Sequence, residues 1–165
     1  MKQNRSWKWV VLFSVTVLFS SCLENFKYPA KTAIKTVYNG YKWNRFAPLE
    51  GKFEISHVNR TYELAFSLSV VDGFELDEVP LEIVITSPDG QENVLNRTME
   101  VKKDGNYVGT AYGDIWTTKL IIYPEKEFLQ AGTYSVFIQN RTQYYDLEKV
   151  ASLEFTVHAV GRVKK

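Results

Sequence analysis

The chain has 165 residues, with 20 basic side chains, 19 acidic side chains and one cysteine. Opposite charges are nearly balanced and interspersed, which excludes the basic surface that nucleic-acid binding requires, and a lone cysteine excludes an internal disulfide. Hydrophobic residues make up 45% of the sequence, so the chain has enough apolar side chains for the core of a folded domain.

The first 21 residues have the pattern of an export signal. Their start is basic, and a mostly apolar stretch over residues 9–19 follows, which is shorter than the roughly 20 residues that span a bilayer. Two small serines then precede Cys22, as bacterial lipoprotein processing requires. We therefore predict that residues 1–21 are a cleaved lipoprotein signal peptide and that Cys22 is lipidated. The basic residues of the signal are Lys2, Arg5 and Lys8.

Lipidation at Cys22 predicts a protein held permanently at a membrane. Each buried methylene contributes about 0.8 kcal/mol to membrane binding, and a lipoprotein cysteine usually carries two or three acyl chains such as palmitate. Residues 22–33 lack a periodic pattern and are predicted to form a lipidated tether. Residues 34–165 are predicted to form a single domain.

Strand patterns dominate the chain from residue 34 on. Over residues 62–70 the large apolar side chains fall on every second position, which is the pattern of a strand with one buried face. Residues 118–123 are more continuously apolar and predict a strand buried on both faces. One turn of helix is predicted near residues 144–149. Strands are predicted near residues 34–38, 41–46, 52–57, 61–72, 81–87, 93–101, 107–112, 118–123, 133–139 and 150–158.

Turn-forming residues separate these strands. Glycine and asparagine tolerate positive φ and proline presets a turn, so their clusters mark chain reversals. Short loops between frequent strands predict an all-β antiparallel β-sandwich, with a jelly-roll-like and an immunoglobulin-like strand order both open. The turns are predicted at Asn39-Gly40, Pro88-Asp89-Gly90, Asp104-Gly105, Gly113-Asp114 and Ala131-Gly132.

A search for catalytic chemistry finds no convincing motif. His57 and His158 are the only histidines, and each lies on a predicted strand without a partner at metal-ligand or triad spacing. No nucleophile elbow or phosphate-binding loop is present. Asp89, Asp104 and Asp114 lie in loops but lack the spaced ligand series of a calcium site. We expect a protein that is not an enzyme and binds no metal or cofactor.

Aromatic residues are the more informative group, because they make up 15% of the chain. Several lie near predicted turns or strand ends, Tyr144 and Tyr145 among them, where they either fill the core and pin loops or form a recognition surface. Rigid aromatic side chains provide contact area at low entropic cost, so such a surface suits a protein partner or the sugar rings of a glycan. The candidate contact residues are Trp43, Tyr107, Tyr112, Trp116 and Arg141.

Several segments together resemble the gliding-motility lipoproteins called GldH. The resemblance rests on residues 103–109, which read Lys-Asp-Gly-Asn-Tyr-Val-Gly, and on Gly113-Asp-Ile-Trp116. The turn Pro88-Asp-Gly90, the segment from Phe128 to Tyr134, and Gln139-Asn-Arg141 also match the order of the family's motifs. The chain departs from the family at Asn140 and over residues 147–153, where a Leu-Pro-Gly-Ile turn is replaced.

The resemblance implies an outer-membrane lipoprotein that supports gliding motility and the associated type IX secretion machinery as a structural component. Its expected partners are other envelope lipoproteins or outer-membrane proteins, besides the membrane itself. Leu23 follows the predicted lipidation site without an inner-membrane retention acid, which favours the outer membrane. Surface export tends to need an acidic cluster just after the cysteine, and only Glu24 is present, so the periplasmic face is favoured over the cell surface.

We expect Asp104, Gly105, Gly109, Gly113 and Asp114 to be structural turn residues. Asp104-Gly105 and Gly113-Asp114 are predicted to form turns, and Gly109 and Gly113 are predicted to be positions where a side chain cannot fit. A lipid-anchored glycan-binding β-sandwich is the alternative function. It predicts coplanar exposed aromatics, for example Trp43, Tyr112 and Trp116, on one concave face.

Overall fold

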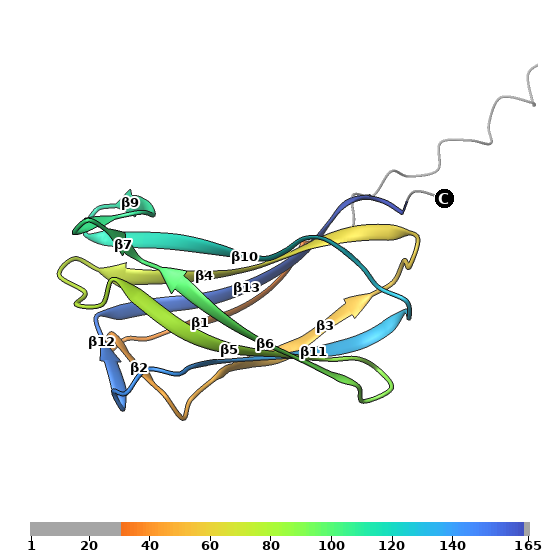
Figure 1. The fold of residues 1–165 in the computed structure, drawn as a ribbon, viewed down its shortest axis with the longest axis horizontal. Helices are drawn as coiled ribbons and strands as arrows, with labels where there is room; N and C mark the ends of the chain where they lie inside the picture. Colours follow the sequence, from red (N-terminus) through yellow and green to blue (C-terminus); the bar gives the residue numbers. More distant parts are fainter. Residues whose placement is uncertain (1–30, 164–165) are drawn as a thin grey trace, which may run out of the picture.

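The computed structural model describes residues 31–163, which form an all-β domain of two packed layers (Figure 1). The predicted signal peptide, Cys22 and all of the predicted tether up to residue 30 lie outside the described residues. Among the residues described, no helix is long and apolar enough to span a membrane. The first strand begins at Thr32, so the last two residues assigned to the tether belong to the sandwich.

One layer is a five-stranded antiparallel sheet in the order β1-β13-β4-β10-β9. Its longest strands pair over most of their length, with β4 between β13 and β10. The central strands β13 and β4 therefore have both edges satisfied. The bounds are β1 Thr32–Val37, β4 Arg60–Val71, β9 Thr110–Tyr112, β10 Ile115–Glu127 and β13 Val150–Arg162.

The other layer is a four-stranded antiparallel sheet in the order β3-β11-β5-β6. Two short ribbons, β2-β12 and β7-β8, complete the domain, and β2 and β12 lie at the left-hand end in Figure 1. The sheet strands are β3 Leu49–Ile55, β5 Glu78–Thr86, β6 Glu92–Glu100 and β11 Gly132–Asn140. The ribbon strands are β2 Lys42–Asn44, β7 Lys102–Lys103, β8 Asn106–Tyr107 and β12 Asp146–Glu148.

The strand order is that of a jelly roll. Eight strands have six or more residues, and in chain order they are β1, β3, β4, β5, β6, β10, β11 and β13. Numbered first to eighth, they give the five-stranded sheet the order first, eighth, third, sixth. The other has the order second, seventh, fourth, fifth. A long hairpin rolled into two layers gives this pairing. The predicted sandwich is confirmed, and of the two orders left open the structure has the jelly-roll-like one.

The alternating apolar positions predicted from the sequence supply the core. In β4 the side chains of Leu64, Phe66, Leu68 and Val70 are buried, and Phe155 of β13 meets Phe66 across the strand pair. In the opposite layer, the side chains of Ile83 on β5 and of its neighbours on β11 also point into the core. Burial of these rows between two sheets is the main source of stability, at roughly 25 cal/mol per Å² of apolar surface.

Three local predictions are wrong. Residues 107–112 form two strands in different sheets, because the chain passes so close to β10 at Gly109 that a Cβ there would lie 2.3 Å from the carbonyl oxygen of Thr117. The strand over 118–123 is buried on one face only, because it belongs to β10 of the five-stranded sheet, whose outer face leaves Ile121 40% exposed. Residues 144–149 hold strand β12 in place of a helical turn, because β2 pairs with that segment.

The two long sides of the sandwich differ. On the closed side the edge strands β1 and β3 abut, and a Cβ on Gly51 would lie 2.8 Å from Cδ1 of Ile34. On the open side the edge strands β6 and β10 are separated by a groove of about 430 Å³, lined by Met99, Thr118 and Leu120 among others. A hydrogen bond of 2.9 Å from Nδ2 of Asn93 to the hydroxyl of Tyr123 bridges the two strands.

Candidate functional site

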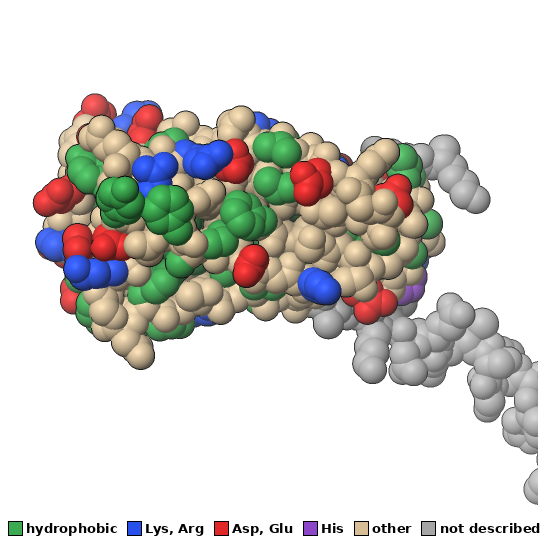
Figure 2. Space-filling model, turned by 90° about the horizontal axis from the view of Figure 1, so that it is seen from below, with side chains coloured by type: hydrophobic (Ala, Val, Ile, Leu, Met, Phe, Trp, Pro, Cys, Tyr) green, Lys and Arg blue, Asp and Glu red, His purple; other side chains and the backbone are tan. Residues whose placement is uncertain are grey.

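An exposed aromatic surface lies where the outer face of the four-stranded sheet meets the β2-β12 ribbon. In Figure 2, which views the molecule from below, hydrophobic side chains gather towards the end that carries this ribbon. Phe46 is 65% exposed and Tyr145 is 69% exposed. We use the name aromatic surface for the set Arg45, Phe46, Glu82, Gln139, Arg141 and Tyr145.

The ribbon holds the two aromatic rings in place. Asn44 pairs with Asp146, and its Nδ2 donates a hydrogen bond of 2.8 Å to Oδ1 of Asp146. The Oδ1 of Asn44 accepts from the backbone N–H of Phe46 at 2.9 Å, which fixes the turn after β2. The backbone N–H of Arg45 donates to the carbonyl of Tyr145 at 2.8 Å. As a result the rings of Phe46 and Tyr145 meet with centroids 5.8 Å apart and planes at 54°.

A chain of polar contacts connects these rings to the four-stranded sheet. Gln139 of β11 donates from Nε2 to the carbonyl oxygen of Arg45 at 2.5 Å. Arg141 contacts Gln139 at 3.5 Å and forms an ion pair of 2.8 Å with Oε2 of Glu82 on β5. The guanidinium of Arg45 lies 5.5 Å from the centre of the Phe46 ring. Tyrosine, phenylalanine and arginine on a pre-formed surface are the residues that protein interfaces favour.

A small hollow lies beside the ribbon. It has a volume of about 120 Å³ and is lined by Phe74, Leu76, Tyr144 and Leu147 together with charged neighbours. Tyr144 is 46% exposed, so part of its ring faces solvent. The hollow adds apolar contact area at the same end of the molecule, and the aromatic surface and the hollow together suit the binding of a protein surface.

The structure contradicts the prediction that Trp43 is a contact residue. Its side chain is fully buried, and its Nε1 donates a hydrogen bond of 3.0 Å to the carbonyl of Ala47. The ring also lies 6.3 Å from that of Phe66. Trp43 is a core residue that anchors β2, because its position on the inner side of the ribbon turns it towards the sandwich. The exposed aromatics of this segment are Tyr41 and Phe46, and Phe46 was not among the predicted contact residues.

Tyr107 and Trp116 pack against each other. Their rings stack with centroids 4.8 Å apart and planes at 14°, and both side chains are half-buried. The Tyr107 hydroxyl accepts a hydrogen bond of 3.0 Å from the backbone N–H of Phe74. The pair pins the β7-β8 ribbon to the start of β10. Tyr112, at 90% exposure, stands apart on β9. With Trp43 in the core, the coplanar platform that glycan binding predicted from Trp43, Tyr112 and Trp116 is not formed.

The predicted turn residues lie in tight turns or close packing. Asp104 and Gly105 have φ of 51° and 77° between β7 and β8, and Gly113 has φ of 63° between β9 and β10. The close packing predicted at Gly113 is wrong, because a Cβ there would have no atom within 4 Å; its positive φ is what favours glycine. The carbonyl of Asp114 accepts a hydrogen bond of 2.8 Å from the N–H of Asp72. In a separate turn, a hydrogen bond from Ser87 lowers the pKa of Asp89 below its ordinary value. Within residues 31–163, no three metal-binding side chains gather closely enough to hold an ion.

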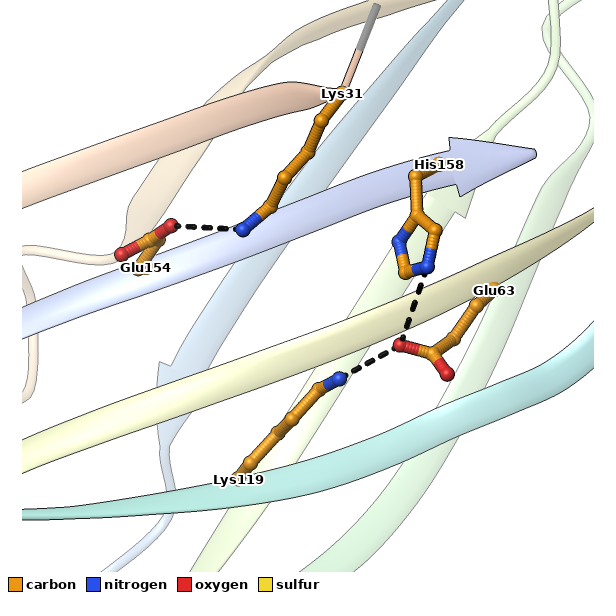
Figure 3. A network of polar contacts seen from close by, with 5 residues as sticks. All are labelled: Lys31, Glu63, Lys119, Glu154 and His158. Atoms are coloured by element: carbon orange, nitrogen blue, oxygen red, sulfur yellow. Dashed lines mark hydrogen bonds and ion pairs between the residues drawn. The ribbon is translucent and has the colours of Figure 1, made fainter. Parts of the chain in front are cut away.

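The two histidines lie apart from the aromatic surface. His57 is exposed in the turn after β3 and not on a strand. Nε2 of His158 lies 3.9 Å from Glu63, whose carboxylate also pairs with Lys119 at 2.7 Å on the outer face of the five-stranded sheet (Figure 3). Ion pairs this exposed contribute about 0–1 kcal/mol to stability.

Comparison with known proteins identifies the family. The sequence profile of the family described as GldH lipoprotein matches residues 32–157. The chain belongs to the GldH lipoprotein family. This GldH-family chain is 24% identical over 162 residues to the gliding motility lipoprotein GldH homolog of Christiangramia forsetii. The alignment covers 94% of the chain and 93% of that relative. The resemblance seen in the motifs is confirmed.

Solved structures give weaker matches to this GldH-family chain. The infectious bursal disease virus VP2 subviral particle aligns with a TM-score of 0.36 and 14% identity, over 79% of the chain and 34% of the viral chain. The Gx strain of that virus aligns with a TM-score of 0.36 and 15% identity, over 78% and 32%. The chain therefore spans about a third of the length of these viral chains.

Proposed function

We propose that this GldH-family lipoprotein is a non-enzymatic interaction component of the envelope machinery for gliding motility and the associated type IX secretion. Membership of the family supports the role in motility. The observation that carries the interaction role is the aromatic surface, where Phe46 and Tyr145 are exposed but held in place by the ribbon. Its proposed partners are other envelope lipoproteins or outer-membrane proteins.

The position of the aromatic surface supports this role. If Cys22 carries the lipid, the nine residues from there to Lys31 reach at most about 30 Å from the membrane. Strand β1 then runs over roughly 17 Å from the start of the described chain, from its pairing with Val157 to its pairing with Ser152. The β2-β12 ribbon follows at that far end, because the N–H of Val150 donates to the carbonyl of Tyr41. The aromatic surface thus lies at the end of the domain far from the proposed attachment. We propose that the attachment is at the periplasmic face of the outer membrane.

A deletion in the native host tests the proposal. We expect loss of colony spreading and retention of type IX cargo in the periplasm, measured by spreading assays and by proteomics of the culture supernatant. A copy with Phe46→Ser and Tyr145→Ser should fail to restore both activities at normal protein level, because the change removes the exposed rings without touching the core. The matched control is Tyr112→Ser, which removes a ring that is 90% exposed outside the aromatic surface and should restore both activities.

Normal spreading and secretion in the deletion strain would show that the proposal is wrong. Full restoration by the double variant would remove the aromatic surface as the carrier of the function. The glycan-binding alternative is not favoured by the geometry, because sugar rings stack on coplanar aromatics and the planes of Phe46 and Tyr145 are inclined by 54°. Glycan-array binding would become the next experiment only if the deletion had no effect.

A further inference from the structure

The open side of the sandwich presents an edge strand whose protection is limited to three charged side chains, Glu92, Arg97 and Glu100. Strand β6 pairs with β5 in an uninterrupted register from Glu100 to Glu92, and it is the last strand of its sheet. It has no proline, no lysine and no bulge along its nine residues. Exposed edges are normally blunted by these features, since unpaired N–H and C=O groups bind other strands.

The neighbouring edge shows the usual protection. Strand β10 carries Pro124 and two register shifts, between Ile121 and Tyr123 and between Tyr123 and Lys126. Lys119 and Lys126 add charge along the same strand. The irregularity of β10 prevents a long strand from pairing there, so the regular edge of β6 is the better template for an added strand.

The inner row of β6 is only partly covered. Leu95 pairs with buried Ile83 and so points to the inside of the sandwich, but it is half-exposed along the open side. Across the groove, Leu120 of β10 is also half-exposed. On the outer face, Val94 is 52% exposed beside Val84 of β5. A strand beside β6 would cover apolar side chains on both of its faces.

Arg97 gives this edge a preference for an incoming strand with an acidic residue. It pairs with buried Leu81, so its side chain leaves β6 on the inner face in line with Leu95. Among residues 31–163 it has no carboxylate within ion-pair distance, and its Nη1 donates instead to the carbonyl of Asn96 at 3.1 Å. The guanidinium therefore lies along the strand edge. An acidic residue on an incoming strand would draw it away and pair with it, whereas a basic residue would be repelled.

We propose that the free edge of β6 binds an extended segment of a partner protein by strand addition, and that Arg97 selects a segment with an acidic residue opposite it. Backbone hydrogen bonds along the edge would supply affinity, and alternate side chains would supply specificity. A second copy of this chain fits less well. Self-pairing centred on Asn96 places Glu92 opposite Glu100, and self-pairing centred on Arg97 places two arginines together.

The experiment uses the full lipidated protein in detergent and synthetic peptides as long as β6, with alternating valine and threonine and a central aspartate or lysine. Fluorescence anisotropy should show the aspartate peptide binding about tenfold more tightly than the lysine peptide. Hydrogen exchange at the amides of β6 should slow when the aspartate peptide binds. The result is independent of the deletion experiment, because binding is measured on purified protein.

Charge variants test the role of Arg97. Arg97→Glu should reverse the preference between the two peptides, and Arg97→Lys should keep it. The matched control is Lys52→Glu on β3, the opposite edge of the same sheet, which should leave the preference unchanged. Circular dichroism checks that each variant is folded.

Three results would overturn the proposal. They are absence of binding, equal binding of both peptides, and slowed exchange outside β6. A concentration-dependent dimer in analytical ultracentrifugation, lost in the Arg97→Glu variant, would make a second copy the occupant and equally reject a partner segment.

Discussion

The closed and open sides of the sandwich protect their edge strands by different means. On the closed side the edges of β1 and β3 cover each other, with Gly51 allowing the side chain of Ile34 to approach. On the open side β6 and β10 stand apart across a groove, joined by the hydrogen bond between Asn93 and Tyr123. On the closed side the packed edges are covered, whereas the open side leaves a strand edge accessible to a partner.

The largest expected effect is a difference in stability between alanine substitutions on the closed side and on the open side. Phe53 of β3 is buried against Tyr134 and Phe155, so Phe53→Ala should lower the free energy of unfolding by about 3–5 kcal/mol. On the open side, Leu95→Ala should cost about 1 kcal/mol, because that side chain is already half-exposed. Urea unfolding monitored by circular dichroism measures both, and equal losses would contradict the comparison.

A smaller effect is expected at one rigid point of the open side. Gly109→Ala should destabilise the fold by about 1–3 kcal/mol, because the added methyl group would meet the backbone carbonyl of Thr117 at 2.3 Å. The control is Gly40→Ala, where an added Cβ has no atom within 4 Å and the change should stay within about 0.5 kcal/mol. Thermal unfolding of both variants compares them. An unchanged midpoint for Gly109→Ala would show that the loop moves freely away from β10.

The smallest effect concerns the end of the closed side at alkaline pH. Burial raises the pKa of Tyr38, which follows β1, from 10.0 to about 12. The folded state therefore favours the neutral phenol. Its contribution is complete below pH 10 and is lost as the pH rises towards 12. Because the hydroxyl is half-buried, solvent screening limits this contribution to about 1 kcal/mol or less.

Tyr38→Phe should accordingly flatten the decline of stability between pH 10 and 12, measured as urea midpoints across that range. Tyr112→Phe is the matched control on the open side and should leave the decline as it is, because that ring is 90% exposed. A decline of equal steepness in all three proteins would assign it to other groups.

The long strands were predictable because their pattern is local. In residues 62–70, 81–85, 134–138 and 153–157 the predicted apolar positions are buried and most positions between them are half-buried, and each segment lies within a strand of the sandwich. The errors come from pairing between distant segments. Residues 146–148 become a strand only because β2 lies beside them, and the one-sided burial of residues 118–123 follows from their place near the edge of the sheet.

The candidate site was only partly predictable. Arg141 and the pair Tyr144-Tyr145 were singled out, and they lie at or beside the exposed end of the molecule. Trp43 was assigned to the surface and Phe46 was overlooked, although the two are three residues apart. Which of two nearby aromatics faces inward depends on the turn that Asn44 fixes and on the pairing with Asp146, and neither leaves a periodic signal in the sequence. The preference of β6 for a segment with an acidic residue was also not predictable from the sequence, because the inward position of Arg97 follows from the register of β6 with β5.

The burial of Trp43 has an optical consequence. Residues 31–163 contain two tryptophans, and their indole rings have unlike surroundings, one on the β2-β12 ribbon and the other on β10 of the five-stranded sheet. The ring of Trp43 is shielded completely from water, whereas that of Trp116 is stacked on Tyr107 and only half-covered. A water-soluble quencher will reach the second fluorophore first. Quenching of tryptophan fluorescence therefore distinguishes loosening of the β7-β8 ribbon from release of β2.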